Sequence, residues 1–133
     1  MSDYLENEFI KHVFRTGSFT KPTALYFSLF TVAPSDSGGG TEVTGGSYAR
    51  VDLPPLDANW DATSGTDGKT ANSSIITFPA PTANWGTVTH GAIFDAISGG
   101  NMLAHGSLLS ATLIENGDPA PTFPAGSVTF TFA

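Results

Sequence analysis

The stretch IITFPAPTANWGTVTHGAIFDAISGGNMLAHGSLL, residues 75–109, decides the fold of this chain. After the breakers Pro79 and Pro81, side chains alternate along residues 85–95 with a period of two, the pattern of a half-buried strand. One face carries Val88, His90, Ala92 and Phe94, and the other carries Thr87, Thr89, Ile93 and Asp95. The apolar segment 102–109 follows a Ser-Gly-Gly-Asn turn that tolerates positive φ. The stretch therefore predicts a β-hairpin.

Further strand patterns lie on both sides of this hairpin. The segments that fit strands are residues 24–32, 48–53, 111–115 and 128–132. Two long polar loops, residues 33–47 and 54–70, lie between the earlier segments. About seven strands separated by turn residues are typical of an antiparallel β-sandwich or a jelly-roll-like barrel. We expect a mainly β single domain over residues 1–133, with its strands within residues 24–132.

One helix is expected at the N-terminal end, over residues 3–16. Asp3 is in position to cap it, and Gly17 is in position to end it. Its apolar residues recur at helical spacing as Leu5, Phe9 and Val13, with Ile10 and Phe14 widening the stripe. A helix this short is marginal alone, so the stripe must pack on something. Two alternatives remain: the stripe covers the domain's own sheet, or it docks on a neighbouring subunit.

Composition excludes several classes of protein. The net charge of −7, with only five Lys and Arg residues, argues against nucleic-acid binding, which needs a basic face. The absence of Cys excludes disulfides and thiolate metal sites. No apolar run approaches the length of a membrane span, and residues 1–4 do not resemble a signal peptide. The low charged fraction of 13% is typical of rigid β-sandwiches that assemble into larger particles.

No catalytic motif is visible, and the sequence predicts no enzyme, metal or cofactor. If the predicted hairpin pairs Asp95 with Met102, Ala92 faces His105, which places His90 diagonal to His105 on the same face. Two imidazoles do not complete a metal site, so we interpret them as a structural or surface pair. Asp57, Asp61 and Asp67 share one loop and are candidate ligands of a weak calcium site, but their spacing does not match the calcium-binding loop of an EF-hand.

Trp60 and Trp85 are the side chains best suited to a binding surface, because tryptophans anchor protein interfaces and stack on sugars. The alternative is that each tryptophan caps one end of the core. Together with Leu5, Phe9 and Val13, they are the candidate contact residues for a partner or for a second copy of the chain.

Several segments carry a resemblance to a known family. They are residues 2–7, 25–27, 40–43, 46–50, 77–79, 85–90, 93–96 and 99–103. In these segments the chain resembles a family of small tailed-bacteriophage virion proteins commonly labelled tail fibre proteins. The likeness spans most of the sequence. Residues 54–69 and the proline-rich approach to the last strand depart from it.

The resemblance implies a non-enzymatic structural protein located in the virion and made in the host cytoplasm. Its partners would be phage capsid or tail proteins, and it would act by protein–protein assembly. Two positions stay open: a capsid decoration, or cement, protein and a short tail fibre or tail-attachment subunit. We expect a homo-oligomer, preferably a trimer, because closed three-fold assembly is common at such sites. The alternative function is a module that binds a host surface glycan or receptor.

Overall fold

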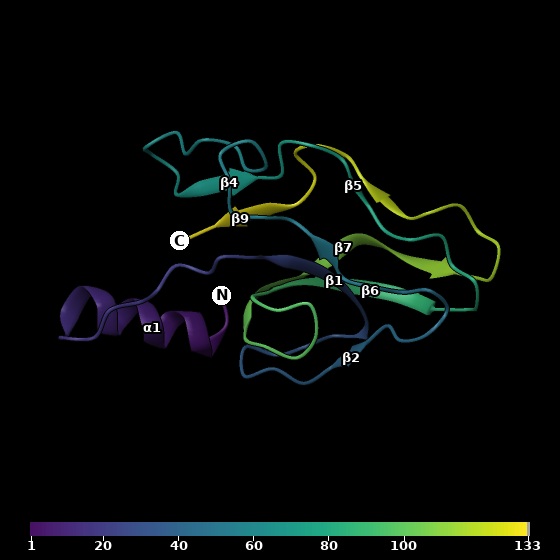
Figure 1. The fold of residues 1–133 in the computed structure, drawn as a ribbon, viewed down its shortest axis with the longest axis horizontal. Helices are drawn as coiled ribbons and strands as arrows, with labels where there is room; N and C mark the ends of the chain where they lie inside the picture. The colour runs from purple at the N-terminus through teal and green to yellow at the C-terminus, as the bar shows by residue number, and fades with distance from the viewer. Residues whose placement is uncertain (133) are drawn as a thin grey trace.

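The computed structural model describes residues 1–132, in which strands paired antiparallel form one main sheet and two small sheets (Figure 1). The path of the main sheet is β2-β1-β6-β7, and β3 also pairs with β1. Its strands are β1 (Tyr26–Val32), β2 (Thr41–Glu42), β3 (Val51–Asp52), β6 (Gly86–Phe94) and β7 (Met102–Ile114). The two small sheets are β4 (Lys69–Ala71) with β9 (Thr129–Thr131), and β5 (Ile76–Thr77) with β8 (Thr122–Phe123). The prediction of a mainly β antiparallel fold with one N-terminal helix is confirmed.

The predicted hairpin is confirmed as β6 and β7, and Ala92 pairs with His105 as expected. The register expected at the turn is wrong: Met102 pairs with Phe94 rather than with Asp95, because the register shifts between Ile93 and Phe94. The strand expected at residues 111–115 is not separate, because β7 continues without interruption to Ile114. The register shifts between Val88 and His90, and this irregularity leaves Leu109 fully exposed on β7. Sequence alternation could not show that the return strand passes through this irregularity.

Other strands are shorter than expected. Within residues 48–53 only Val51–Asp52 pairs, and the loop predicted at 33–47 contains β2. The loop predicted at 54–70 leads into β4, which begins at Lys69. These segments are held mainly by side-chain packing and isolated hydrogen bonds.

An aromatic cluster fixes the covering segments to the sheet. Phe27 of β1 contacts Phe78 and Phe123, with ring centroids 5.7 Å and 5.0 Å away. Tyr48 stacks on Phe78 and meets Trp85 edge-on at 5.3 Å. Such aromatic pairs contribute about 0.5–1.5 kcal/mol each beyond the burial of their area. The core therefore lies between the main sheet and the segments that carry β5 and β8.

Gly91 of β6 makes room for this cluster. A Cβ atom at residue 91 would lie 2.7 Å from Cε2 of Phe27, well inside van der Waals contact. Gly106 is its cross-strand partner on β7, yet a Cβ atom there would meet nothing within 4 Å. A methyl group is thus excluded at residue 91 but has room at residue 106, although the two residues are paired.

Arg50 ties the strands to the β6–β7 turn. Its guanidinium donates to both carboxylate oxygens of Glu42 at 2.8 Å and to the carbonyl oxygens of Ala96 and Gly99 at 2.7 and 2.9 Å. The same group lies 3.8 Å above the ring of Phe94. A bidentate, largely buried pair of this kind has nearly all its donors satisfied, so it fixes geometry as well as contributing attraction.

Tyr48 completes this network. Its hydroxyl donates to Glu42 at 2.9 Å and accepts the backbone N–H of Leu29 at 3.0 Å. Burial raises the pKa of Tyr48 far above its ordinary value near 10, and the neighbouring Glu42 carboxylate raises it further. The phenol is therefore neutral in the folded protein at every ordinary pH.

Asn72 joins the middle of the chain to its C-terminal segment. Its side chain is fully buried, donates to the carbonyl oxygens of Ser74 and Pro124, and accepts the N–H of Val128 at 2.8 Å. Both N–H groups and the oxygen of the amide are engaged inside the protein, so Asn72 is a fixed link between the two segments.

Helix α1 spans Asp3–Phe14, and its N-cap residue lies one position earlier than expected. Ser2, rather than Asp3, is the N-cap: its hydroxyl oxygen accepts the N–H of Leu5 at 3.3 Å. The Ser2 hydroxyl also donates to the carbonyl of Met102, and the Ser2 N–H donates to the carbonyl of Leu103 at 3.0 Å. The first turn of α1 is thereby fixed to the start of β7.

We expect Gly91→Ala to lower the free energy of unfolding by about 1–3 kcal/mol, because the new methyl group overlaps the ring of Phe27. Gly106→Ala, the matched control on the paired position, should leave stability unchanged or slightly raised. Urea unfolding of both variants measures the difference. Equal effects of the two substitutions would contradict the steric role of Gly91.

The raised pKa of Tyr48 predicts a pH dependence of stability. Its contribution is fully present below the unfolded-state pKa of about 10 and is lost as the pH rises above it, because only the unfolded chain then releases the phenolic proton. Tyr48→Phe should be less stable at neutral pH, since Leu29 and Glu42 lose their partner. Its stability should fall less steeply between about pH 9 and 11. Parallel curves for the two proteins would contradict the prediction.

Candidate assembly surface

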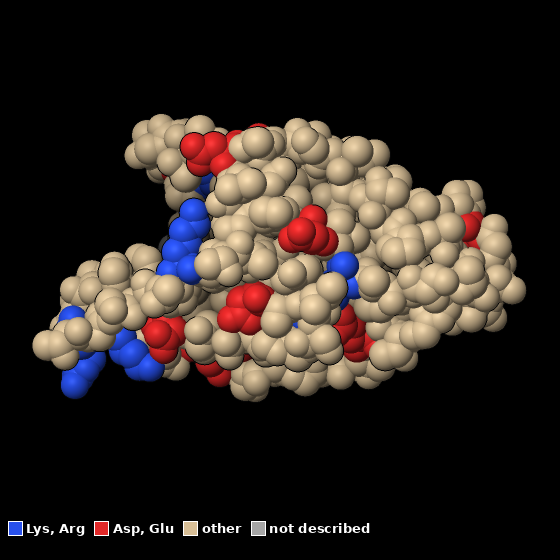
Figure 2. Space-filling view, in the orientation of Figure 1, with Lys and Arg blue, Asp and Glu red and all other residues tan. Residues whose placement is uncertain are grey.

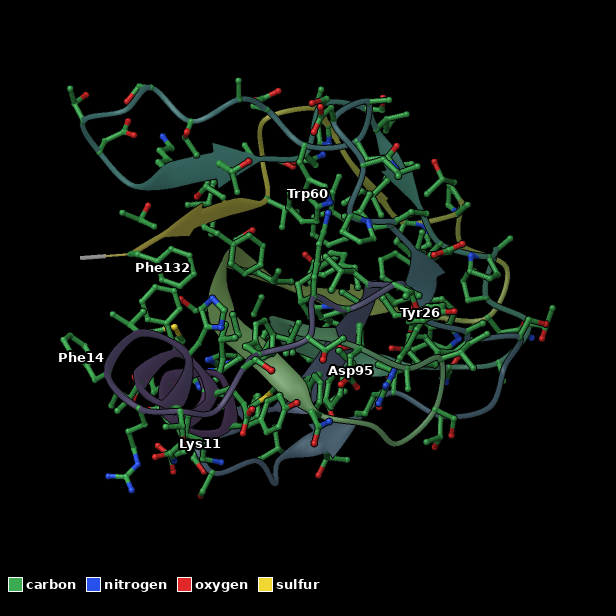
Figure 3. The ribbon with its side chains drawn as sticks, turned by 60° about the vertical axis from the view of Figure 1, so that its left-hand side comes forward. Lys11, Phe14, Tyr26, Trp60, Asp95 and Phe132 are labelled. Carbon is green, nitrogen blue, oxygen red and sulfur yellow. The ribbon has the colours of Figure 1, made fainter. Side chains whose placement is uncertain are left out.

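Helix α1 carries an apolar stripe that the domain does not cover. Tyr4 and Leu5 pack partly against the core, whereas Phe9, Ile10 and Val13 are each about half exposed and Phe14 is 79% exposed. No residue of α1 is buried. In Figure 1 the helix extends away from the sheets, and Figure 3 shows Phe14 pointing outward from it. We call Phe9, Ile10, Val13 and Phe14 the helix stripe.

The first of the two alternatives for this helix is therefore wrong for most of its length. Ser2 fixes the start of the helix to β7, and beyond Leu5 the large apolar side chains of the helix are half exposed or more. The expectation that the helix covers its own sheet holds for Leu5 and fails for Phe9 and Val13.

An apolar groove opens beside the base of α1. It has a volume of about 680 Å³ and lies between the helix start, the loop at residues 55–63 and strand β9. Its large apolar lining residues are Met1, Leu5, Leu25, Leu56, Trp60, Ile93, Leu103, Phe130 and Phe132. Met1, Leu56 and Phe132 are 41%, 59% and 57% exposed, so the rim as well as the floor is apolar. We call this the docking groove.

The two tryptophans have different positions. Trp85 is 5% exposed and donates its indole N–H to the carbonyl of Gly46 at 2.9 Å, so it is a core residue and offers no surface to a partner. Trp60 is half-buried and lies in the docking groove with its ring edge-on to Phe130 at 5.6 Å. Figure 3 shows Trp60 between the β4–β9 pair and the main sheet. Of the two, Trp60 alone is placed for contact.

The structure thus brings together part of the predicted set. Leu5 and Trp60 line the same groove, and Phe9 and Val13 lie further along the helix that starts there. Sequence reasoning missed Leu56 and Phe132. Leu56 follows a Pro-Pro pair in an irregular loop, where no periodicity indicates its exposure. Phe132 was expected inside the last strand, but it follows the end of β9 and lies at the groove rim.

The histidines and acids considered for chemistry do not converge. His105 lies 3.0 Å from Asp36, and Nδ1 of His90 lies 2.8 Å from the hydroxyl of Thr89. Asp61 accepts from Ser73, and Asp67 accepts from Ser64, a bond that lowers the pKa of Asp67. Among residues 1–132, no three His, Cys, Asp or Glu side chains are placed to hold a metal ion.

Charge is sparse around the docking groove. Its charged lining residues are Asp57 and Asp61. One basic residue lies beside the groove, because Lys21 donates to the carbonyl of Pro55 in its lining at 3.1 Å. Other basic residues lie toward the far end of α1, at Lys11, His12 and Arg15. Figure 2 shows blue atoms at the tip of the helix, further blue atoms between the helix and the part of the fold above it, and several separate red patches across the same face.

Across the part of the chain that the structure describes, no helix is both long and apolar enough to cross a membrane. The family model that matches the sequence is described as Podophage GP4 fiber I protein gp80, and the match covers residues 1–131. A comparison with curated proteins gave no match.

Exposure along α1 predicts two different outcomes for charged substitutions. Phe9→Asp should change the free energy of unfolding by less than about 1 kcal/mol, because the Phe9 side chain is already about half exposed to solvent. Leu5→Asp should cost about 1–3 kcal/mol, because it places a carboxylate against the core. Thermal unfolding followed by circular dichroism checks both. A large loss of stability in Phe9→Asp would show that the stripe belongs to the domain's own core.

Proposed function

The chain belongs to the family described as Podophage GP4 fiber I protein gp80, and from this we propose that it is a short tail fibre or tail-attachment subunit of a podophage. Membership makes it a structural component of the virion. In our proposal it is not an enzyme, and it acts on the particle exterior by protein–protein assembly. The fibre family favours the tail over capsid decoration, the other position that the sequence left open.

The observation that carries this proposal is the uncovered helix stripe. Its four large apolar side chains stay 51–79% exposed, although the rest of the chain builds a well-packed core. An apolar patch of this kind marks an interaction surface. In a structural protein of a particle, the natural occupant is another virion subunit.

Simple energetics favour assembly through several contacts at once. Full burial of a large apolar side chain is worth about 1.5–3 kcal/mol, so completing the burial of the stripe yields roughly 3.5–7 kcal/mol. Association of two proteins costs about 4–15 kcal/mol of rigid-body and side-chain freedom. One stripe on a flat surface is therefore too weak. A closed oligomer, for which we favour a trimer, improves this balance, because a trimer forms three interfaces in two association steps.

The chain can contribute only a short structure to a tail. Its one helix within residues 1–132 has 12 residues, and its longest strand, β7, has 13. Neither forms an extended shaft. The proposal is accordingly a compact subunit that attaches at or near the tail, rather than a long fibre.

A second candidate function is binding of a host surface glycan. Trp60 lines the docking groove near the carboxylates of Asp57 and Asp61, and sugars are bound by aromatic rings with acidic acceptors. The groove is otherwise mainly apolar, and the indole N–H of Trp60 faces the protein interior, buried and without a hydrogen-bond partner in the described chain. For these reasons we rank the glycan function second.

The test is light scattering coupled to size exclusion, followed by binding of the purified chain to isolated tails and to empty capsids. We expect an oligomer that binds tails, and a Phe9→Asp variant that stays folded but neither assembles nor binds. Ile75→Asp is the matched control, because Ile75 is 60% exposed and lies outside both the helix and the groove.

Two results would redirect the proposal. Binding to capsids instead of tails would make the protein a decoration subunit. Retention on a host polysaccharide that is lost in Trp60→Ala would favour the glycan function.

A further inference from the structure

We propose that the docking groove of one copy receives the helix stripe of a second copy. The inference rests on the proposed function in one respect, namely that the chain assembles with other subunits. It adds which two surfaces of the chain meet. It makes the interface head-to-tail: each subunit inserts its own helix and accepts the helix of a neighbour.

The geometry prevents the stripe from filling the groove of its own chain. Helix α1 starts at the groove, where Met1 and Leu5 are part of the lining. Ser2 holds that end to β7 through the carbonyl groups of Met102 and Leu103. At about 1.5 Å of rise per residue, Phe9 and Val13 lie roughly 6 and 12 Å beyond Leu5 along the axis. A straight helix cannot bring them back.

The two surfaces are complementary in chemistry and size. The groove has an apolar floor of Trp60 and Phe130 and an apolar rim that includes Leu56 and Phe132. Its volume of about 680 Å³ is that of a pocket for a medium-sized ligand, which suits a row of side chains from one helix. The stripe presents its large side chains at the three- and four-residue spacing with which helices enter grooves.

Charge supports a second copy as the occupant. Asp57 and Asp61 are the charged residues of the groove lining, and neither makes an ion pair within residues 1–132. Arg15 directly follows α1 and also makes no ion pair in that range, whereas Lys11 is paired with Glu8 at 2.8 Å. When the helix stripe of one copy enters the docking groove of a second copy, the guanidinium of Arg15 therefore approaches the carboxylates of Asp57 and Asp61. In a net-acidic protein, this contact favours self-association where overall charge opposes it.

Mixing two variants tests the proposal. Phe9→Asp places a charge on the helix stripe and leaves the groove unchanged. Leu56→Asp places a charge on the groove rim and leaves the stripe unchanged. Both positions are more than half exposed, so both variants should fold. Each variant alone should lose self-association by roughly 30-fold or more. An equimolar mixture should form a 1:1 complex, because one intact stripe then meets one intact groove.

The outcomes separate this inference from the proposed function. Self-association that survives in Leu56→Asp would show that stripes pack on each other, and the inference would be wrong. Persisting monomers in the mixture would overturn it as well. A wild-type monomer that still binds tails through Phe9 would also overturn it, yet the proposed function would stand.

Charge reversal gives an independent measurement. Arg15→Glu and Asp57→Lys should each weaken self-association, and the double variant should recover most of the loss, because the reversed pair meets across the interface. Additive losses in the double variant would overturn the proposed contact. Both residues are exposed in the single chain, so folding is not at risk.

Discussion

Contact between aromatic rings is the interaction on which the rest of this structure depends. Phe27 from the main sheet, Phe78 from the middle of the chain and Phe123 from the C-terminal segment meet at centroid distances of 5.0–5.9 Å. The segments that cover the sheet pair only through two- and three-residue strands, which alone would not hold them. Ring packing therefore determines where the second layer lies, and Gly91 is required because the ring of Phe27 occupies the space of its side chain.

The docking groove follows from this arrangement. The aromatic cluster closes the fold around Phe78, while Trp60 pairs with Phe130 at a separate point of the covering layer. Between that pair and the base of α1 the layer leaves an apolar hollow. The helix starts at its edge and carries its remaining apolar side chains outward. The apolar surfaces of the groove and of the helix stripe are thus kept apart within one chain, as the proposed contact between chains requires.

The sequence predicted the elements with strong periodicity and missed those governed by packing. The β6–β7 hairpin, its pairing of Ala92 with His105 and the N-terminal helix all followed from alternation or helical spacing. The continuity of β7 past Leu109 and the short strands did not, because an irregular register and two-residue pairings leave no periodic signal. Helical spacing likewise identified the stripe but could not say what covers it, and Trp85 could not be told from Trp60, since burial depends on neighbours distant in sequence.

The positions of the two chain ends have a practical consequence. Met1 and Phe132 both line the docking groove, and Figure 1 shows the two termini on the same side of the fold as the helix. An affinity tag or a fluorescent fusion at either end would emerge at the mouth of the groove, where a flexible extension would obstruct the helix that we propose to bind there. A label that leaves the surface clear belongs in an internal loop away from it, such as the exposed turn at Asn116-Gly117.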